Sequence, residues 1–320
     1  MMYKLIMAPT EGSDSEKPAV LAAVRLAQQF DAMLRLVRVD PAPLVLQAVP
    51  HQPVLEITED TLREERRARL RKLETEGAEY RKAGIRVVTS LEDGPVGPAL
   101  REYAEKFGVD LIVMSSHARG GIKRVALGSV TDYLIRHTHI PVLVVKEGRT
   151  LLNAAPKSSV TRIVVPLDGS ALAEQILPDV ASLALRINAT VSLVHVLTPT
   201  TYSQERIMQP GLPWWDADMA AAEAYLARTA SHLAEDGVAV SRDVVIGQNI
   251  AQSILDFAAR ARADLLAIAT SGAGGMTRFV FGSVADEVTR QSPTSLLVFH
   301  PKAQAAVKET PAENTALAEA

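Results

Sequence analysis

Residues 161–170 read TRIVVPLDGS, and residues 4–13 read the similar KLIMAPTEGS. Two further pairs follow in the same order: VDLIVMSS at 109–116 with ADLLAIAT at 263–270, and GSVTD at 128–132 with GSVAD at 282–286. The second copy follows the first by 157 residues in the first pair and by 154 residues in the other two. Because order and spacing recur together, the sequence predicts a tandem duplication.

The 320 residues divide into two predicted domains, residues 1–147 and 161–300. Each is long enough to form its own hydrophobic core. Residues 148–160 mix Gly, Pro, Ser and charge without a sustained period, and we interpret them as a linker. Residues 301–320 are rich in Ala, Glu and Pro, which predicts a disordered tail.

Each half alternates strand patterns with helical ones. In the first half the predicted strands are 4–8, 33–39, 85–90, 110–115 and 142–145, with helices at 17–30, 58–82, 96–107 and 129–136. In the second half the predicted strands are 162–166, 190–196, 238–245, 264–269 and 295–299, with helices at 171–186, 217–236, 249–262 and 283–290.

This alternation favours right-handed crossovers and a parallel sheet with helices on both faces. Apolar runs such as LIVM and LLAIA fit strands that are buried on both faces. Ligands of such sheets bind outside the carboxyl ends of the strands, where the strand order reverses. The loops after the first, second and fourth strands of each half are therefore the candidate site.

The loop after the fourth strand ends in Gly-Ser in both halves, at Gly128-Ser129 and at Gly282-Ser283. A helix is predicted to begin there, with Ser129 and Ser283 as N-caps. Backbone N–H groups at a helix start bind phosphate, and glycine lets the backbone approach it closely. The alternative interpretation is that Gly-Ser only marks a helix start.

Composition narrows the function classes. The chain has no cysteine, which excludes disulfides, thiolate metal ligands and a cysteine nucleophile. Its formal net charge is −3, so bulk electrostatics predict no nucleic-acid partner. We find no signal-peptide pattern and no apolar run of about 18 residues, and we therefore expect a cytoplasmic protein with no membrane partner.

Several of these residues resemble the motifs of the universal stress protein family. They are the turn Leu167-Asp168-Gly169-Ser170, the helix start Gly282-Ser283-Val284 and the last-strand run IPVLVV at 140–145. The resemblance covers residues 3–146 and 161–300. It implies two tandem Rossmann-like domains of the adenine nucleotide α-hydrolase-like class, each with a five-stranded parallel sheet in the order 3-2-1-4-5.

The resemblance also implies a nucleotide site after the first, second and fourth strands. The residues implied in the second domain are Pro166, Leu167, Asp168, Val196, Thr270, Gly272, Gly282, Ser283 and Val284. Their weaker first-domain counterparts are Glu11, Val39, Gly128 and Ser129. Asp168 is expected to accept from the sugar, the backbone of Val196 to meet adenine, and the amides of 282–284 to hold phosphates.

The family's phosphate loop has the pattern G-x2-G-x9-G-[ST]. The second copy keeps two of its three glycines, with Ala269 in place of the first, whereas the first copy keeps only Gly128. Because a Cβ at such a position strains or blocks the loop, we expect nucleotide binding mainly in the second domain.

The resemblance indicates a stress-response module that binds ATP, with Mg²⁺ as an accompanying ion. No nucleophile–base pair is visible near the loops, so we expect no enzyme beyond slow ATP hydrolysis. The alternative is a nucleotide-free stress protein that acts through protein contacts. The last strands, Val142–Val145 and Ser295–Phe299, are expected to self-associate, as an intramolecular pseudo-dimer or as a homodimer.

Other residues keep two interpretations. Arg124 and Arg278 each lie four residues before the Gly-Ser pair and either reach phosphate or are solvated. Trp214 and Trp215 either cover the pocket or pack locally. His195 has no partner pattern for catalysis or metal binding, and we expect it to be structural.

Overall fold

The structure is a computed structural model that describes residues 3–40, 59–116, 127–146, 161–198, 213–270 and 281–301. The predicted linker 148–160 and nearly all of the predicted tail 301–320 lie outside these residues. The domain boundaries that we drew from the sequence therefore stay a prediction.

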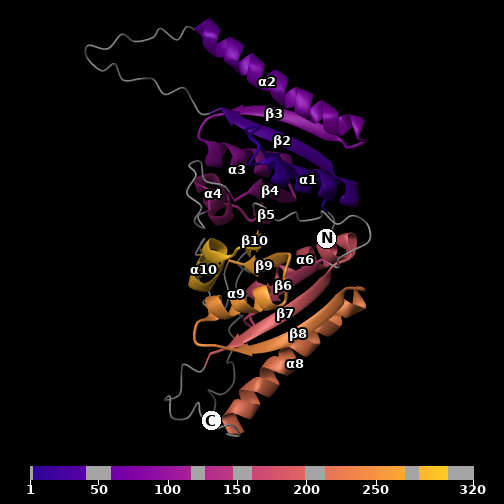
Figure 1. The fold of residues 1–320 in the computed structure, drawn as a ribbon, viewed down its shortest axis with the longest axis vertical. Helices are drawn as coiled ribbons and strands as arrows, with labels where there is room; N and C mark the ends of the chain where they lie inside the picture. The colour runs from indigo at the N-terminus through magenta and orange to yellow at the C-terminus, as the bar shows by residue number, and fades with distance from the viewer. Residues whose placement is uncertain are drawn as a thin grey trace, which may run out of the picture.

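The described strands form one ten-stranded sheet in the order β3-β2-β1-β4-β5-β10-β9-β6-β7-β8 (Figure 1). The strands of the first half are β1 (Leu5–Pro9), β2 (Met33–Asp40), β3 (Val87–Asp93), β4 (Leu111–Ser115) and β5 (Val142–Val145). Those of the second half are β6 (Arg162–Pro166), β7 (Thr190–Leu197), β8 (Ala239–Ile246), β9 (Leu265–Ala269) and β10 (Ser295–Phe299). Each half is parallel and has the order 3-2-1-4-5, which confirms the predicted topology.

The helices of the first half are α1 (Lys17–Phe30), α2 (Glu59–Lys82), α3 (Val96–Phe107) and α4 (Ser129–His137). Those of the second half are α5 (Ala171–Glu174), α6 (Leu177–Ile187), α8 (Pro213–Glu235), α9 (Ile250–Arg260) and α10 (Ser283–Gln291). The single helix predicted at 171–186 is wrong, because it is divided into α5 and α6. Pro178 explains the break: its ring clashes with the carbonyl four residues earlier, at Glu174, where α5 ends.

The sheet has a hydrophobic core on each face. Because successive strand residues point to opposite faces, Ile6 and Ala8 of β1 lie in one core and Met7 lies in the other. Helices α1, α2, α6 and α8 cover the first face, and α3, α4, α9 and α10 cover the second. Residues of both halves contribute to both cores.

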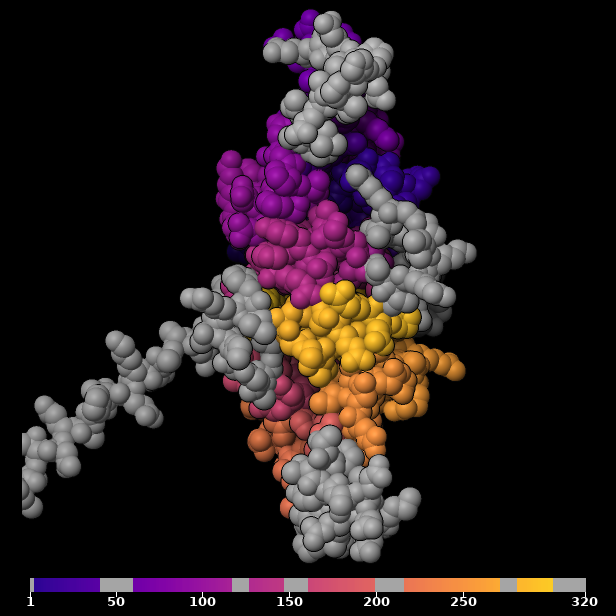
Figure 2. Space-filling model, turned by 90° about the vertical axis from the view of Figure 1, so that its left-hand side faces the viewer, coloured from indigo at the N-terminus to yellow at the C-terminus, as the bar shows by residue number. Residues whose placement is uncertain are grey.

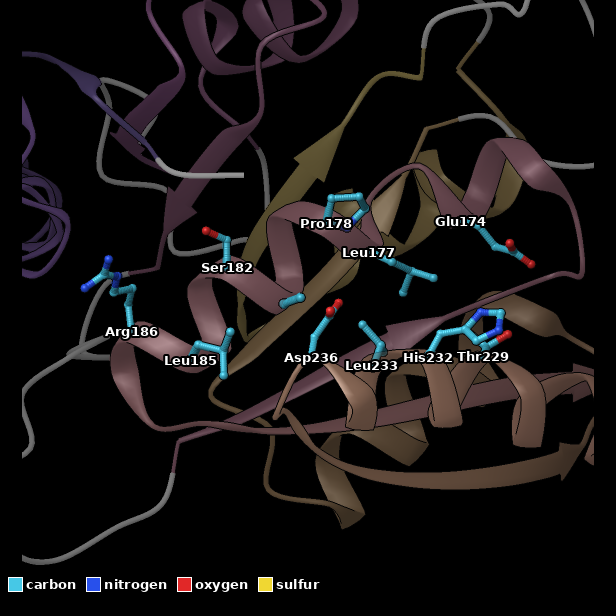
Figure 3. A pocket seen from close by; sticks show the side chains of 11 residues that line it. Glu174, Leu177, Pro178, Ser182, Leu185, Arg186, Thr229, His232, Leu233 and Asp236 are labelled. Carbon is cyan, nitrogen blue, oxygen red and sulfur yellow. The ribbon is translucent and has the colours of Figure 1, made fainter.

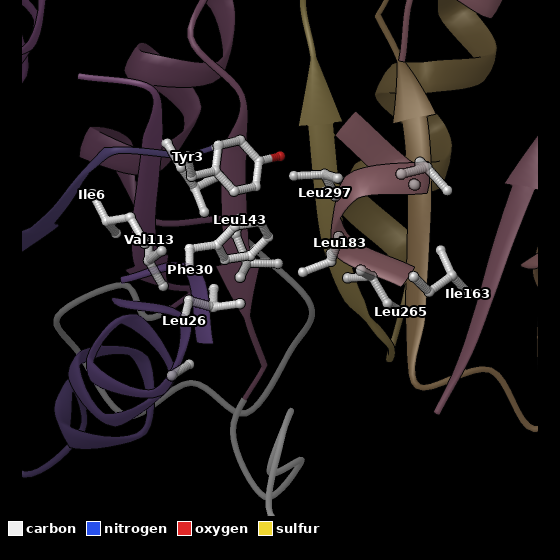
Figure 4. Close-up of a cluster of buried hydrophobic side chains, with 14 of the residues drawn as sticks. Tyr3, Ile6, Leu26, Phe30, Val113, Leu143, Ile163, Leu183, Leu265 and Leu297 are labelled. Atoms are coloured by element: carbon white, nitrogen blue, oxygen red, sulfur yellow. The ribbon is translucent and has the colours of Figure 1, made fainter. Parts of the chain in front are cut away.

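The two halves join through β5 and β10, which pair antiparallel. Leu143 lies opposite Leu297, and both side chains are buried in the core of the first face (Figure 4). All four residues of β5 are buried. The predicted pairing of the last strands within one chain is therefore confirmed, whereas a homodimer of the whole chain stays a prediction.

One buried carboxylate lies at this junction. Asp179 on α6 is 4% exposed, and its Oδ1 atom has no hydrogen-bond partner among the described residues. Burial raises the pKa of Asp179. Burial and then the neighbouring Asp179 also raise the pKa of Tyr3, a residue of the other half. The second domain thus places an ionisable group against the first domain in a nonpolar setting.

We expect Asp179→Asn to gain stability relative to the wild type as pH rises from about 4 towards neutrality. Since the folded-state pKa is raised, the stabilising contribution of protonated Asp179 is complete below the unfolded-state pKa. It is lost as pH rises through the folded-state pKa. Asparagine stays neutral throughout. Urea unfolding of both proteins across this range measures the difference.

The matched control is Asp14→Asn. Lys17 lowers the pKa of the exposed Asp14, so this variant should lose a little stability relative to the wild type over the same rise in pH. If the difference in unfolding free energy between Asp179→Asn and the wild type did not change with pH, burial would not raise the pKa of Asp179.

Candidate functional site

The candidate site lies at the carboxyl edge of the sheet in each domain. In the first domain β1 is flanked by β2 and β4, and in the second β6 is flanked by β7 and β9. From β1 the chain continues to β2 and β3 on one side of the sheet, whereas β4 and β5 lie on the other side of β1. The second domain repeats this arrangement around β6, so the strand order reverses at β1 and at β6. The loops that follow these strands meet at one edge because the strands are parallel.

The first domain has a cleft of about 1000 Å³ at this edge. All four predicted first-domain residues line it: Glu11, Val39, Gly128 and Ser129. Apolar side chains from β2, α3 and β4 also line the cleft, among them Val37, Leu100 and Met114. This volume is at the upper end of the range of small-molecule sites.

A second cavity of about 550 Å³ lies between α6 and α8 (Figure 3). Its lining combines apolar residues, such as Leu177 and Leu233, with Glu174, His232 and Asp236. None of the residues predicted to bind nucleotide lines it, so we do not place the nucleotide site there.

In the second domain, the turn after β6 presents the acidic residue. Pro166 ends β6, Leu167 is buried, and Asp168 is exposed. The Oδ1 atom of Asp168 accepts hydrogen bonds from the backbone N–H and the hydroxyl of Ser170, at 3.0 and 2.6 Å. Gly169 has φ +85°, a left-handed conformation that favours glycine.

The first-domain turn has the same backbone but a different support. Gly12 has φ +76° at the place of Gly169. The turn is held by the Glu16 carboxylate, which accepts from the backbone N–H of Glu11 at 2.7 Å. Arg38 donates to the Glu11 carbonyl at 2.8 Å. In the second domain, by contrast, His195 Nδ1 lies 2.8 Å from the Leu167 carbonyl, which agrees with a structural role for His195.

The predicted adenine contacts lie at the ends of the second strands. Val196 is half-buried near the end of β7 and is paired with Val245 of β8. Its counterpart Val39 is buried near the end of β2 and lines the first-domain cleft. Both positions are therefore at the sheet edge at which the resemblance places adenine.

Thr270 follows β9, and its side chain points into the protein. It is fully buried, and its hydroxyl lies 2.6 Å from His300 Nδ1. Burial, with a smaller effect of His139, lowers the pKa of His300 to about 4. The Thr270 side chain thus packs against His300 at the end of β9, and the role of Thr270 in nucleotide binding stays a prediction.

Thr270 also sets the start of α10. Its carbonyl accepts from the Gly282 N–H at 2.7 Å, so this amide is not available for phosphate. A Cβ on Gly282 would lie 3.2 Å from the same carbonyl oxygen. The glycine is thus needed partly for packing, and in this structure its amide bonds to Thr270, so the amides of Ser283 and Val284 carry the prediction of phosphate binding.

The helix starts also differ from the predicted capping. Gly128 and Gly282 are the N-cap residues, with extended backbones at φ −60° and −63°, and Ser129 and Ser283 are the first helical residues. Both serines are exposed. The first amides of a helix have no partner within it, so Ser283 and Val284 can offer their N–H groups to an anion.

Some predicted residues lie outside the described part of the chain. These are Gly272, Arg124 and Arg278. The side chains of Trp214 and Trp215 are likewise not described. Their predicted roles stay predictions.

The sequence analysis missed a set of residues beside the site. Asp132 and Arg136 of α4 meet Asp286 and Arg290 of α10 in ion pairs that cross the domain boundary. The signal was present, because the Asp-x-x-x-Arg spacing recurs at the same 154-residue offset. It resembled an ordinary exposed helix pair, and only the tertiary structure shows that these side chains of α4 and α10 meet.

Comparison with known proteins agrees with this architecture. The sequence model of the universal stress protein family matches residues 2–146 and again residues 159–300. The chain belongs to the universal stress protein family. Its two matches to one family model confirm the duplication that the repeats predicted.

Individual relatives show the same arrangement. The universal stress protein MJ0531 of Methanocaldococcus jannaschii is 35% identical over 149 residues, which cover 46% of this chain and 85% of that protein. The universal stress protein YxiE of Bacillus subtilis is 29% identical over 152 residues, covering 45% of this chain and all of that protein. Each is thus similar to about half of this universal stress protein.

A solved universal stress protein from Archaeoglobus fulgidus is similar over both halves. Its TM-score is 0.67 at 17% identity, and the match covers 94% of this chain and 99% of that chain. At this identity the similarity supports the fold alone.

None of the described helices combines a membrane-spanning length with the required apolarity.

We expect Thr270→Val to lower the free energy of unfolding by about 1–3 kcal/mol, because it leaves the buried His300 ring without its hydroxyl partner. Thr289→Val is the matched control: Thr289 is 1% exposed, and its hydroxyl has no hydrogen-bond partner among the described residues. That variant should be neutral or slightly stabilising. Equal losses in urea unfolding would contradict the role given to the Thr270–His300 bond.

Proposed function

We propose that this universal stress protein binds an adenine nucleotide, ATP in the first instance, at the carboxyl edge of at least its second domain. The observation that carries the proposal is the exposed start of α10, which the Gly282–Thr270 hydrogen bond fixes at the end of β9. The same edge carries Asp168 after β6 and Val196 on β7. The helix start proposed to bind an anion follows β9, the acidic residue follows β6, and the apolar residue lies near the end of β7; these three strands are adjacent.

Each group has a specific proposed role. The Asp168 carboxylate accepts a hydrogen bond from the sugar, since a carboxylate has about four acceptor sites and the two bonds from Ser170 both go to Oδ1. The backbone of Val196 meets adenine, and Pro166 and Leu167 form the wall beside it. The amides of Ser283 and Val284 hold phosphate at the positive end of the α10 dipole. On sequence grounds, Gly272 belongs to the same phosphate loop.

Mg²⁺ accompanies ATP in this proposal. Among the described residues there is no group of three or more His, Cys, Asp or Glu side chains that could hold a metal ion. The phosphates and water would therefore supply most of the ligands, which is usual for Mg²⁺ bound with a nucleotide.

The first domain offers a second, weaker site. Its cleft contains the counterparts of the second-domain residues, but its phosphate loop keeps only Gly128 of the three glycines. We propose that the protein is a cytoplasmic binding or sensing module with at most slow ATP hydrolysis, built from domains 1–147 and 161–300.

The test compares Ser283→Glu with Ser129→Glu in the full chain by titration calorimetry with MgATP. A carboxylate in the first turn favours each helix but repels a bound phosphate. We expect Ser283→Glu to weaken ATP binding roughly tenfold or more, and Ser129→Glu to have the smaller effect. This pair is cleaner than Gly282→Val, whose Cβ would press on the Thr270 carbonyl even without ligand.

Two outcomes of this titration would contradict the proposal. If the wild type binds no ATP at millimolar concentration and releases no nucleotide on denaturation, the protein is nucleotide-free and acts through protein contacts. If the wild type binds ATP and neither serine variant changes the affinity, the phosphate end of the site is wrongly assigned.

A further inference from the structure

The last turn of α4 is linked to the first turn of α10 across the domain boundary. The Nε atom of Arg136 lies 3.0 and 3.1 Å from the two carboxylate oxygens of Asp132 on its own helix. Its terminal nitrogen donates to Asp286 on α10. Arg290 Nε lies 3.0 Å from the other oxygen of Asp286. Figure 2 shows the two segments in contact, with the magenta residues of the first domain against the yellow residues of the second.

This link is not symmetric, although its charged residues repeat. The Arg136 guanidinium also lies over the ring of Phe281, 4.5 Å from its centroid. The residue equivalent to Phe281 in the first domain is Leu127, which has no aromatic face to offer. In the reverse direction Arg290 comes only within 4.0 Å of Asp132. Its side chain is 54% exposed, whereas that of Arg136 is 27% exposed.

Arg136 therefore contacts residues on both sides of the start of α10. Phe281 directly precedes Gly282, and Asp286 is three residues after Ser283. A planar guanidinium that stacks on the ring and pairs with the carboxylate fixes both in one geometry. The helix start between them cannot rotate without breaking one contact.

Arg136 also has an electrostatic effect on the same helix start. Asp286 lies in the first turn of α10, near where an anionic phosphate would bind. Although burial opposes ionisation, the hydrogen bonds from Arg290 and Arg136 lower the pKa of Asp286, so it carries a negative charge at neutral pH. The two arginines offset this charge, which would otherwise repel phosphate.

We propose that Arg136 of the first domain is a positioning residue for the phosphate end of the nucleotide site of the second domain. The inference rests on the proposed function. It adds that the second site depends on the first domain being docked against it, whereas the first site receives no equivalent support from Arg290.

The experiment measures MgATP binding to the full chain carrying Ser129→Glu, so that the titration reports the second domain. We expect Arg136→Ala to raise the dissociation constant roughly tenfold, as expected for losing a stacked and ion-paired arginine. Arg290→Ala removes a half-exposed arginine and its share of the charge compensation at Asp286 but leaves the Phe281 contact intact, so its dissociation constant should rise only about two- to threefold.

Two further variants separate positioning from general stability. Arg136→Lys keeps the charge but lacks the planar group that stacks on Phe281, so it should restore only part of the affinity. Phe281→Leu gives the second domain the residue of the first and should weaken binding in the same direction. When Phe281→Leu is combined with Arg136→Ala, the dissociation constant should rise little further, because both substitutions remove the same contact between Arg136 and Phe281.

Thermal unfolding of each variant provides the readout that a purely structural role would affect. Arg136→Ala should lower the melting temperature more than Arg290→Ala, because Arg136 is less exposed and also contacts Phe281. Below both melting temperatures, where each variant is folded, Arg136→Ala should still show the larger loss of ATP affinity. The proposal is overturned if Arg136→Ala binds ATP as the parent does, or if Arg290→Ala weakens binding equally. It is also overturned if Ser129→Glu alone abolishes binding. Absence of ATP binding in the wild type would instead refute the proposed function itself.

Discussion

The antiparallel pairing of β5 with β10 is the interaction on which the rest of the structure depends. Each half alone would be a five-stranded sheet with an apolar last strand at its edge, and such edges tend to pair with other chains. Here each strand covers the other, with Leu143 opposite Leu297. The result is one ten-stranded sheet with a core on each face to which both domains contribute.

That pairing places the last helices of the two halves against each other. Helices α4 and α10 each begin at a Gly-Ser pair that follows the fourth strand of its half. Once β5 and β10 are joined, these helices pack across the boundary, and their charged residues form the network around Arg136 and Asp286. The elements proposed to hold phosphate are thus also among the elements through which the two domains contact each other.

The two copies have diverged around a shared backbone. Both keep a left-handed glycine in the turn after the first strand, Gly12 and Gly169, because other residues are strained there. The side chains that brace this turn differ: Glu16 and Arg38 in the first domain, His195 in the second. The two domains thus share the backbone geometry of this edge but differ in the side chains that support it.

The sequence by itself determined the duplication, the strand order, the class of fold and the edge at which the site lies. The duplication, the class of fold and the site edge follow from local periodicity and from repeated motifs such as GSVTD and GSVAD, which are properties of short segments. The strand order came from the resemblance to the universal stress protein family. Only the tertiary structure showed that Thr270 is buried against His300, that the Gly282 amide is already bonded, and that Arg136 lies over Phe281. These contacts join residues far apart in the chain, and no local pattern encodes which atoms of such residues become partners after folding.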